Sequence, residues 1–254
     1  MKGIILGSGT GVPSLRRNAP GYWLEIKGHQ FLVDCGSGIL LQLERVGKSF
    51  QNLDAIFITH THADHIGDLI PFVHALRLPG MHRDKPLTLY GPPGFVEFFE
   101  RIVVPVSAPP TDFPFRVQEV APIQALDGVL LKSCATPHSD RFACRAYRFE
   151  YQGLSVVFSG DTDFHPDLVT FCRAADVLFL ECSSLDAGKV DGHLSAGLCG
   201  KIAEMAGVKR LILTHFYPID GPDSLFFDEC RSHFSGVLEL AIDLNSFAVE
   251  TNLP

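Results

Sequence analysis

The sequence predicts an α/β protein, and three observations support this class. Short apolar runs rich in β-branched residues recur along the chain, and many of them stop at a polar or glycine-bearing turn. Stretches with helical spacing of apolar residues separate these runs. The chain has 254 residues, of which 46% are hydrophobic, so it can bury a sizeable core. Since no linker, repeat or low-complexity tract interrupts it, we expect a single domain over residues 1–254.

The predicted elements alternate along the chain. The expected strands are the β-branched runs at 3–6, 31–33, 55–58, 87–90, 129–131, 154–158, 177–180 and 210–213. The expected helices cover 39–46, 66–78, 94–103, 166–174, 195–206 and 225–232. The helix at 195–206 has the clearest pattern, because Leu198, Ile202 and Met205 form a core-facing stripe and Gly207 can end it.

Composition excludes several classes of protein. The net charge is −8 and the two signs are interspersed, which argues against a broad binding surface for duplex DNA or long RNA. The seven cysteines are scattered, odd in number and form no CxxC pair, so we interpret them as reduced thiols of a cytoplasmic protein. The first apolar run is too short for a signal peptide or a membrane span.

Four of the predicted strands are followed by a potential metal ligand. "IFITH" ends on His60, "LLKSCATPH" on His138, "SVVFSGD" on Asp161 and "RLILTH" on His215. In sheet proteins, functional groups collect at strand ends, where rigid elements hold them and solvent reaches them. The four endings therefore predict a shared site.

The segment "THTHADH" concentrates histidines and a carboxylate. In an extended chain, His60 and His62 point to the same side and can bind one ion together. Asp64 and His65 follow where the chain turns into a helix, so they point elsewhere and indicate a second ion. Imidazole and carboxylate ligands without thiolates suit zinc, manganese or iron. A structural cluster without metal is physically expensive, because so many polar groups would be buried without partners.

Four motifs in this order, "THTHADH", "TPHS", "SGDT" and "LTHF", resemble those of the metallo-β-lactamase superfamily. The resemblance covers most of the chain. It implies a four-layer αββα sandwich of two mixed β-sheets with helices on the outer faces, and a site for two divalent metal ions, zinc first, with manganese or iron as alternatives. The ligands that it implies are His60, His62 and His138 for one metal, Asp64, His65 and His215 for the other, and Asp161 as a bridge.

Further segments narrow the resemblance to the ribonuclease Z group and its phosphodiesterase relatives. They are "LGSGTGVPSLRRN", "LVDCGSG" and "LTLYGPPG", with "LECS" followed by "GHLSA". The last two place Glu181 and His193 at the paired positions of that group. We therefore assign catalytic roles to Asp64, His193 and Glu181, with His193 as a proton donor supported by the Glu181 carboxylate. A solvent-facing loop is the plainer alternative for His193.

This sequence differs from the ribonuclease Z group in one feature that bears on the substrate. The transfer-RNA processing enzymes carry a long arm between the third histidine and the bridging aspartate, whereas His138 and Asp161 here are 23 positions apart. We therefore expect a phosphodiesterase that acts on small phosphodiesters or cyclic nucleotides through a metal-bound hydroxide. The resemblance also implies a homodimer.

Other functions stay open on the sequence alone. The same fold carries out ribonuclease Z-type RNA cleavage, thioester or lactone hydrolysis and iron-dependent sulfur oxidation. A non-catalytic binding protein is the alternative of a different class, but such proteins typically lose ligands and none is lost here.

Four features near the motifs have two interpretations each. Asp34 either orients a ligand histidine or caps a turn. The basic cluster at 77–85 forms either a phosphate rim or a solvated loop. The glycines at 7–11 lack the spacing of a dinucleotide-binding loop and predict a turn close to the site. Phe216 and Tyr217 are either core residues or part of a pocket wall.

Overall fold

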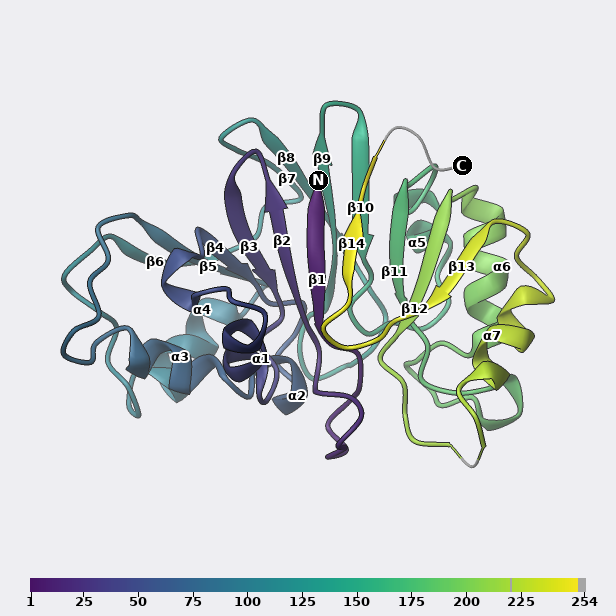
Figure 1. Ribbon diagram of the computed structural model, residues 1–254, viewed down its shortest axis with the longest axis horizontal. Coiled ribbons are helices and arrows are strands. Elements are labelled where there is room, and N and C mark those ends of the chain that lie inside the picture. The colour runs from purple at the N-terminus through teal and green to yellow at the C-terminus, as the bar shows by residue number, and fades with distance from the viewer. Residues whose placement is uncertain (220, 251–254) are drawn as a thin grey trace.

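The computed structural model describes residues 1–219 and 221–250 of the protein and contains two seven-stranded sheets. Figure 1 shows helices α1 to α4 gathered beside the N-terminal sheet and α5 to α7 beside the C-terminal sheet. The strand order is β14-β1-β2-β3-β4-β5-β6 in one sheet and β13-β12-β11-β10-β9-β8-β7 in the other. The predicted sandwich of two mixed sheets with outer helices is thus confirmed.

The N-terminal sheet combines antiparallel and parallel pairing. Its strands are β1 (Lys2–Gly7), β2 (Gly21–Ile26), β3 (His29–Val33), β4 (Ala55–Phe57), β5 (Leu87–Gly91), β6 (Phe115–Glu119) and β14 (Ser246–Ala248). Strands β3 to β6 run parallel, whereas β1 pairs antiparallel with both β2 and β14. The parallel section is the part that leads into the histidine-rich segment, because that segment follows β4.

The C-terminal sheet is divided in the same way. Its strands are β7 (Ile123–Leu126), β8 (Val129–Ala135), β9 (Arg145–Tyr151), β10 (Leu154–Phe158), β11 (Val177–Glu181), β12 (Arg210–Thr214) and β13 (Val237–Leu240). Strands β7 to β10 pair antiparallel, and β10 to β13 run parallel. The carboxyl ends of parallel strands meet at one edge of a sheet, so β10, β11 and β12 deliver their following residues to the same place.

The helices are short and lie between strands. They are α1 (Ile39–Arg45), α2 (Ala63–Ile66), α3 (Leu69–Ala75), α4 (Phe95–Phe98), α5 (Pro166–Phe171), α6 (Ala196–Ala206) and α7 (Ser224–Arg231). A π-helical turn, η2 (Phe99–Val103), continues α4, and 3-10 turns η1 (Phe50–Asn52) and η3 (Asp186–Gly188) complete the set. Among the described residues, no helix is long and apolar enough to cross a membrane.

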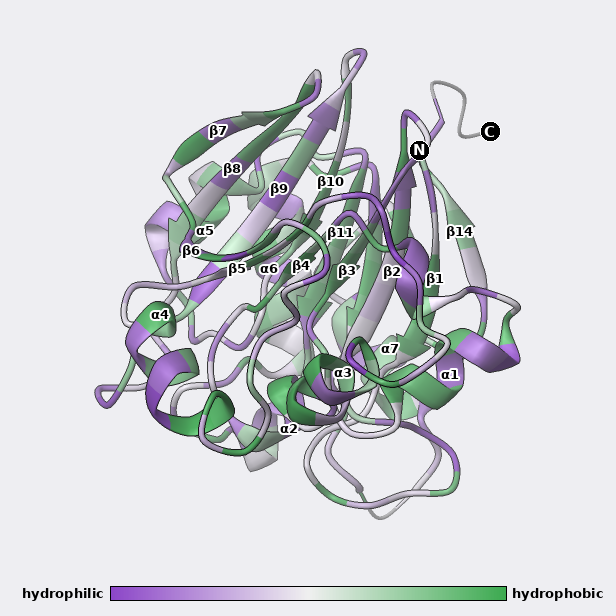
Figure 2. Ribbon diagram, turned by 90° about the vertical axis from the view of Figure 1, so that its left-hand side faces the viewer, coloured by the Kyte–Doolittle hydropathy of each residue, from purple (hydrophilic) through white to green (hydrophobic). Residues whose placement is uncertain are grey.

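Aromatic side chains fill the space between the sheets. The Phe57 ring lies 5.7 Å from Phe31 and 5.1 Å from Phe149, and Tyr22 lies 5.1 Å from Phe158. Each of these buried side chains contributes about 1.5–3 kcal/mol relative to an exposed position. A second apolar cluster packs the N-terminal sheet against its helices. Figure 2 shows apolar residues concentrated in the central strands of the sheets, which therefore form a rigid base for the strand-end loops.

All eight predicted strands are present, but the helix predicted over 66–78 is wrong in form. The chain makes two helices, α2 and α3, separated at Gly67 and Asp68. The Asp68 carboxylate accepts hydrogen bonds from the backbone N–H groups of Gly38 and Leu40 at the start of α1. A Cβ at position 67 would lie 2.1 Å from the Ser37 hydroxyl. Contact with the loop before α1 therefore interrupts the helix.

Candidate metal centre

All seven candidate ligands lie together in the segments that follow strands β4, β8, β10 and β12. The structure places them as follows: His60 and His62 after β4, Asp64 and His65 in α2, His138 after β8, Asp161 after β10 and His215 after β12. Their ligand atoms form groups in which every atom lies within 4.8 Å of every other. Residues separated by more than 150 positions thus converge on one site.

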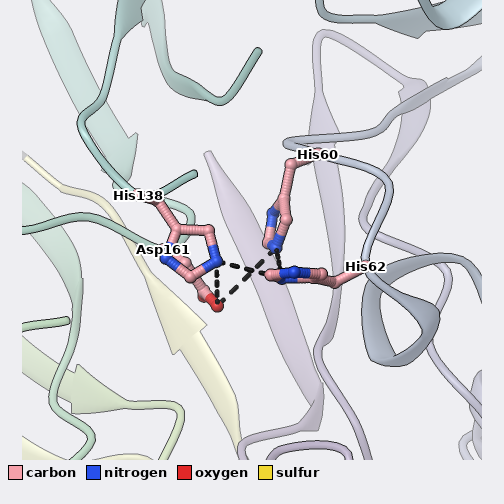
Figure 3. A group of neighbouring side chains, drawn as sticks. All are labelled: His60, His62, His138 and Asp161. Atoms are coloured by element: carbon pink, nitrogen blue, oxygen red, sulfur yellow. Dashed lines mark hydrogen bonds and ion pairs between the residues drawn. The ribbon is translucent and has the colours of Figure 1, made fainter. Parts of the chain in front are cut away.

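The first cradle, as we call it, consists of His60, His62, His138 and Asp161 (Figure 3). The Nδ1 atom of His62 lies 3.0 Å from Nε2 of His60 and 3.0 Å from Nε2 of His138. The Asp161 Oδ2 atom lies 3.7 Å and 3.6 Å from the same two Nε2 atoms. Nitrogens that bind one tetrahedral zinc ion at about 2.0–2.1 Å are themselves about 3.3 Å apart, so the observed spacing is close to that of a ligand set.

The protons of this cradle point away from its centre. The Thr59 hydroxyl donates to Asp34, so its oxygen is free to accept from Nδ1 of His60 at 3.1 Å. Nδ1 of His138 donates to the backbone carbonyl of Gly192 at 2.8 Å. A neutral imidazole carries one proton. The Nε2 atoms of His60 and His138 therefore present lone pairs to the centre, which is the state that a cation requires.

The second cradle consists of Asp64, His65 and His215. The Asp64 Oδ2 atom lies 3.4 Å from Nε2 of His215 and 3.8 Å from Nε2 of His65. The Oδ1 atom of Asp161 lies 3.3 Å from both Nε2 atoms. One carboxylate thus reaches both cradles, Oδ2 facing the first and Oδ1 facing the second.

Three buried atoms, two in the second cradle and one on Asp161 beside it, show that the site suits a cation. His65 Nε2, His215 Nε2 and Asp161 Oδ1 have no hydrogen-bond partner among the described residues. An unpaired buried polar atom costs about 1–3 kcal/mol, and here three such atoms face one another. Imidazole nitrogens and carboxylate oxygens are borderline-hard ligands that divalent metals accept. The His/Asp cluster is therefore suited to binding divalent metal.

Asp34 orients one candidate ligand. Its Oδ2 atom accepts from Nδ1 of His65 at 2.8 Å and from the Thr59 hydroxyl at 2.9 Å, and its Oδ1 accepts from the Thr59 N–H. The geometry matches the first of the two roles expected for it. Asp34 has a left-handed φ of 58°, as does His215 with 60°. Non-glycine residues with such backbone angles cost about 1 kcal/mol or more, and here they aim two side chains at the site.

A similar arrangement on the C-terminal sheet holds His193. The Ser183 hydroxyl donates to Glu181 at 2.9 Å and lies 3.1 Å from Nδ1 of His193 and 3.3 Å from Nδ1 of His215. Nδ1 of His193 also contacts Glu181 Oε1 at 2.9 Å. Burial acts to lower the pKa of His193, but the Glu181 carboxylate outweighs it and raises that pKa. The solvent-facing loop considered for His193 is wrong, since the residue is 6% exposed.

The position of His193 also allows a second role, as a metal ligand. Its ring nitrogen, Asp161 and His215 form a third group of ligand atoms within 4.8 Å of one another. Its Nδ1 lies 3.9 Å from Asp161 Oδ2, farther than the 2.9 Å to Glu181. The closer contact favours Glu181 as the partner of Nδ1.

The electrostatics of the cluster follow from burial and from these carboxylates. Burial and the neighbouring His65 hold the pKa of His60 well below its usual range. For His65 the burial penalty is outweighed by Asp161 and Asp34, which raise its pKa. Burial acts to raise the pKa of Asp161, but His215 and His65 outweigh it and lower that pKa. The cluster thus keeps Asp161 ionised, as a ligand carboxylate must be.

Two of the other candidate positions serve the fold. The Arg83 guanidinium donates to the backbone carbonyls of Gln51, Leu53, Lys85 and Pro86, and burial lowers its pKa to about 10. It ties down a loop and forms no phosphate rim. Phe216 is buried against Phe226, 4.9 Å away, and it also lines the cleft beside Tyr217, so both interpretations of this residue hold.

Two other features do border the site. The Tyr217 ring lies 5.6 Å from that of His193. The glycine turn approaches it as predicted, since a Cβ on Gly11 would lie 3.5 Å from that of Asp64.

Comparison with known proteins places this geometry in a family. The profile of the β-lactamase superfamily domain matches residues 29–216. The chain belongs to the metallo-β-lactamase superfamily. A ribonuclease Z from Mycobacterium sp. (strain KMS) is 29% identical over 273 residues, covering 96% of this chain and 95% of the relative.

Solved structures agree with this assignment. The metallo-β-lactamase fold protein YhfI from Bacillus subtilis has a TM-score of 0.83 at 27% identity, covering 97% of this chain and 99% of YhfI. The short form of human tRNase Z has a TM-score of 0.79 at 23% identity, covering 98% of this chain and 100% of that one. Together with the His/Asp cluster, these likenesses identify the chain as a metal-dependent hydrolase.

Three site residues of this superfamily member were not predicted from the sequence. Thr59 and Ser183 each connect a carboxylate to two histidines, and the Gly192 carbonyl fixes the tautomer of His138. Thr59 and Gly192 each directly precede a histidine of the site, and Ser183 follows Glu181 by two residues. Hydroxyls that flank predicted ligands are therefore the signal that could have identified two of the three.

Proposed function

We propose that this protein is a binuclear phosphodiesterase that hydrolyses small phosphodiesters or cyclic nucleotides. The observation that carries the proposal is the pairing of two cradles through Asp161, with a carboxylate-bound histidine, His193, beside them. Two cations in such an arrangement, which we expect to be zinc, supply Lewis acidity for phosphate oxygens and lower the pKa of water toward neutrality. The residues His60, His62, His138, Asp64, His65, His215 and Asp161 would hold them.

The chain itself supplies orientation. Asp34, Thr59 and Gly192 fix the tautomers of His65, His60 and His138. Their hydrogen bonds keep the site in one arrangement before a substrate arrives, so little reorganisation is needed during the reaction.

His193 would move a proton. In the Glu181-bound state, Nδ1 donates to the carboxylate, which leaves Nε2 to donate to the oxygen of a departing alcohol. Glu181 is buried and accepts from Thr162, Ser183 and His193, so it stays in place while the proton is transferred. Poor leaving groups depend most on this step.

The segment between His138 and Asp161 supports a small substrate. It consists of a loop at 139–144 followed by β9 and β10, which pair antiparallel within the sheet. No long arm is inserted among these described residues, and this favours a small substrate over a folded RNA.

Ribonuclease Z activity is the second candidate, and the names of the curated relatives favour it. The two functions share the site and differ in the size of the substrate. Metal-loaded protein should therefore be assayed on bis(p-nitrophenyl) phosphate, on cyclic nucleotides and on a transfer-RNA precursor with a 3′ trailer. We expect turnover of the small esters and little cleavage of the precursor. Efficient processing of the precursor, without turnover of cyclic nucleotides, would assign the second function instead.

Thioester and lactone hydrolysis belong in the same assay. The proposal predicts that thioester and lactone substrates are turned over more slowly than the phosphodiesters. A thioester or lactone hydrolysed faster than any phosphodiester would overturn it.

A further inference from the structure

A cleft of about 460 Å³ borders the metal centre on the side of the first cradle. Its lining includes Thr61, which lies between His60 and His62 in the chain, and Phe142. The Phe142 ring lies 4.7 Å from the His62 ring and 5.9 Å from the His60 ring, stacked at 22° on the latter. Phe142 thus belongs to the lining of the cleft and also lies next to two histidines of the first cradle. Its volume is within the range of sites that hold small organic molecules.

Away from Phe142 the lining is mostly apolar, although the charged Glu97 and Arg101 also belong to it. Its apolar part is formed by α4 and η2, which contribute Phe98 and Ile102, and by Pro92 at the end of β5. Ile102 is 50% exposed. A lining that combines aromatic rings with prolines suits a planar aromatic group, which stacks on such surfaces.

A free cation lies at the same cleft. The Arg141 side chain lines it and makes no hydrogen bond or ion pair to any described residue. Arg101, also on the lining, is paired with Glu97 at 2.9 Å. In a chain with a net charge of −8, an unpaired guanidinium on this lining attracts anions and carbonyl oxygens locally.

The neighbouring clefts do not offer this combination. The cleft of about 200 Å³ beside Tyr217 also contains arginines, but Arg16 and Arg17 both pair with Asp223. Arg17 is further held by the Ala241 carbonyl and stacks over Phe216 at 4.4 Å. Its arginines are therefore engaged within the fold.

We propose that the cleft between Phe142 and Ile102 binds the nucleobase of a nucleoside phosphodiester. This inference rests on the phosphodiesterase function proposed above and narrows its substrate class. The base stacks between the aromatic wall and Ile102, and Arg141 donates to a base carbonyl. The phosphodiester then lies over the first cradle, because Phe142 contacts both of its N-terminal histidines.

The experiment compares two esters with the same leaving group on the metal-loaded protein. They are thymidine 5′-(p-nitrophenyl phosphate) and methyl p-nitrophenyl phosphate. We expect kcat/KM to favour the nucleoside ester by at least about tenfold, since base stacking alone is worth that much. Ile102→Asp and Arg141→Ala should each reduce this ratio several-fold. Val106→Asp is the matched control: Val106 lies on the same segment and is 68% exposed, but is not on the cleft lining.

Each outcome bears on a different part of the proposal. If the ratio of the two kcat/KM values is near one, or if Ile102→Asp and Arg141→Ala leave it unchanged, the cleft is not a nucleobase site. The proposed phosphodiesterase function stands in that case. If neither ester is hydrolysed, the proposed phosphodiesterase function is wrong. Calorimetric binding of thymidine 5′-monophosphate then tests whether the cleft binds a nucleobase. Binding that weakens about tenfold in Ile102→Asp, but not in Val106→Asp, supports it. Equal binding by the wild-type protein, Ile102→Asp and Val106→Asp overturns the proposed nucleobase site.

Discussion

The two sheets each place a hydroxyl–carboxylate pair beside the cluster, and the two pairs serve different histidines. On the N-terminal sheet, Thr59 donates to Asp34, and Asp34 holds His65. On the C-terminal sheet, Ser183 donates to Glu181, and Glu181 holds His193.

The difference between the pairs lies in which ring nitrogen of the histidine lies near the carboxylates of the cluster. Nε2 of His65 faces Asp64 and Asp161 and has no other partner, so it is set up to bind a cation. His193 approaches the cluster with Nδ1, which its carboxylate already occupies at 2.9 Å. If the proposed roles hold, the comparison teaches that one orienting arrangement prepares a ligand in His65 and a proton donor in His193, depending on which ring nitrogen the carboxylate leaves free toward the cluster.

The largest loss of activity should come from changing Asp161, the residue that both cradles share. Asp161→Ala removes the oxygens that face the two cradles, so we expect loss of bound metal together with loss of hydrolysis to the level of buffer. Asp64→Ala, which removes one ligand of the second cradle, should abolish turnover and lower the metal content as well. Elemental analysis of each purified variant, beside an assay of bis(p-nitrophenyl) phosphate, measures both quantities. Wild-type activity in either variant would be incompatible with the shared site.

His193→Ala should have the next largest effect and tests the proton-donor side of the comparison. We expect the rate to fall by about 10²- to 10⁴-fold for esters of poor leaving groups, because general acid catalysis contributes that much. Metal content should stay at the wild-type value. Esters of nitrophenol should lose much less, since that leaving group needs no proton. An equal loss for both kinds of ester, or a loss of metal, would assign His193 to the ligand set instead.

Exchanging the two carboxylates for amides should separate their roles. Asp34→Asn weakens the hold on His65, so we expect metal affinity to fall by about 10- to 100-fold, as is typical for groups that orient ligands. Glu181→Gln should leave metal affinity close to wild type and reduce kcat for poor leaving groups. Competition with a metal-sensitive chelating dye measures the first quantity, and steady-state kinetics measure the second. An equal change of metal affinity in both variants would contradict the different roles proposed for Asp34 and Glu181.

Removing the hydroxyls should have the smallest effect. Thr59→Val and Ser183→Ala each delete hydrogen bonds worth about 1 kcal/mol apiece, which corresponds to a change of roughly fivefold for each bond lost. We expect Thr59→Val to act mainly on metal affinity and Ser183→Ala mainly on the rate. The same titrations and kinetics serve here, and an effect larger than that of the matching carboxylate variant would show that the hydroxyl is the dominant group.

The N-terminal part of the site was predictable because it is contiguous. His60, His62, Asp64 and His65 lie within six residues after a strand, and spacing alone separates them into two directions. In the C-terminal part, the strand-end positions of His138, Asp161 and His215 already indicated that they belong to the site. Their assignment to one ion or the other needed the family resemblance, since they follow three different strands whose order in the sheet the sequence does not show.

Other features depend on tertiary contacts that no local pattern carries. The division of the helix at Gly67 results from the distant contact of Asp68 with α1. Strands β6 and β7 are largely polar or exposed, so their hydrophobic signal is weak. Arg83 looks like a surface cation in the sequence, but tertiary folding buries it among backbone carbonyls.

The most direct test of the central claim measures metal and hydrolysis in the same samples. Wild-type protein is stripped with a chelator, reconstituted with graded amounts of zinc, and assayed on bis(p-nitrophenyl) phosphate at each bound stoichiometry. We predict no turnover in the stripped protein and full turnover only as a second ion per chain is bound. Hydrolysis at the wild-type rate in metal-free protein would contradict the account.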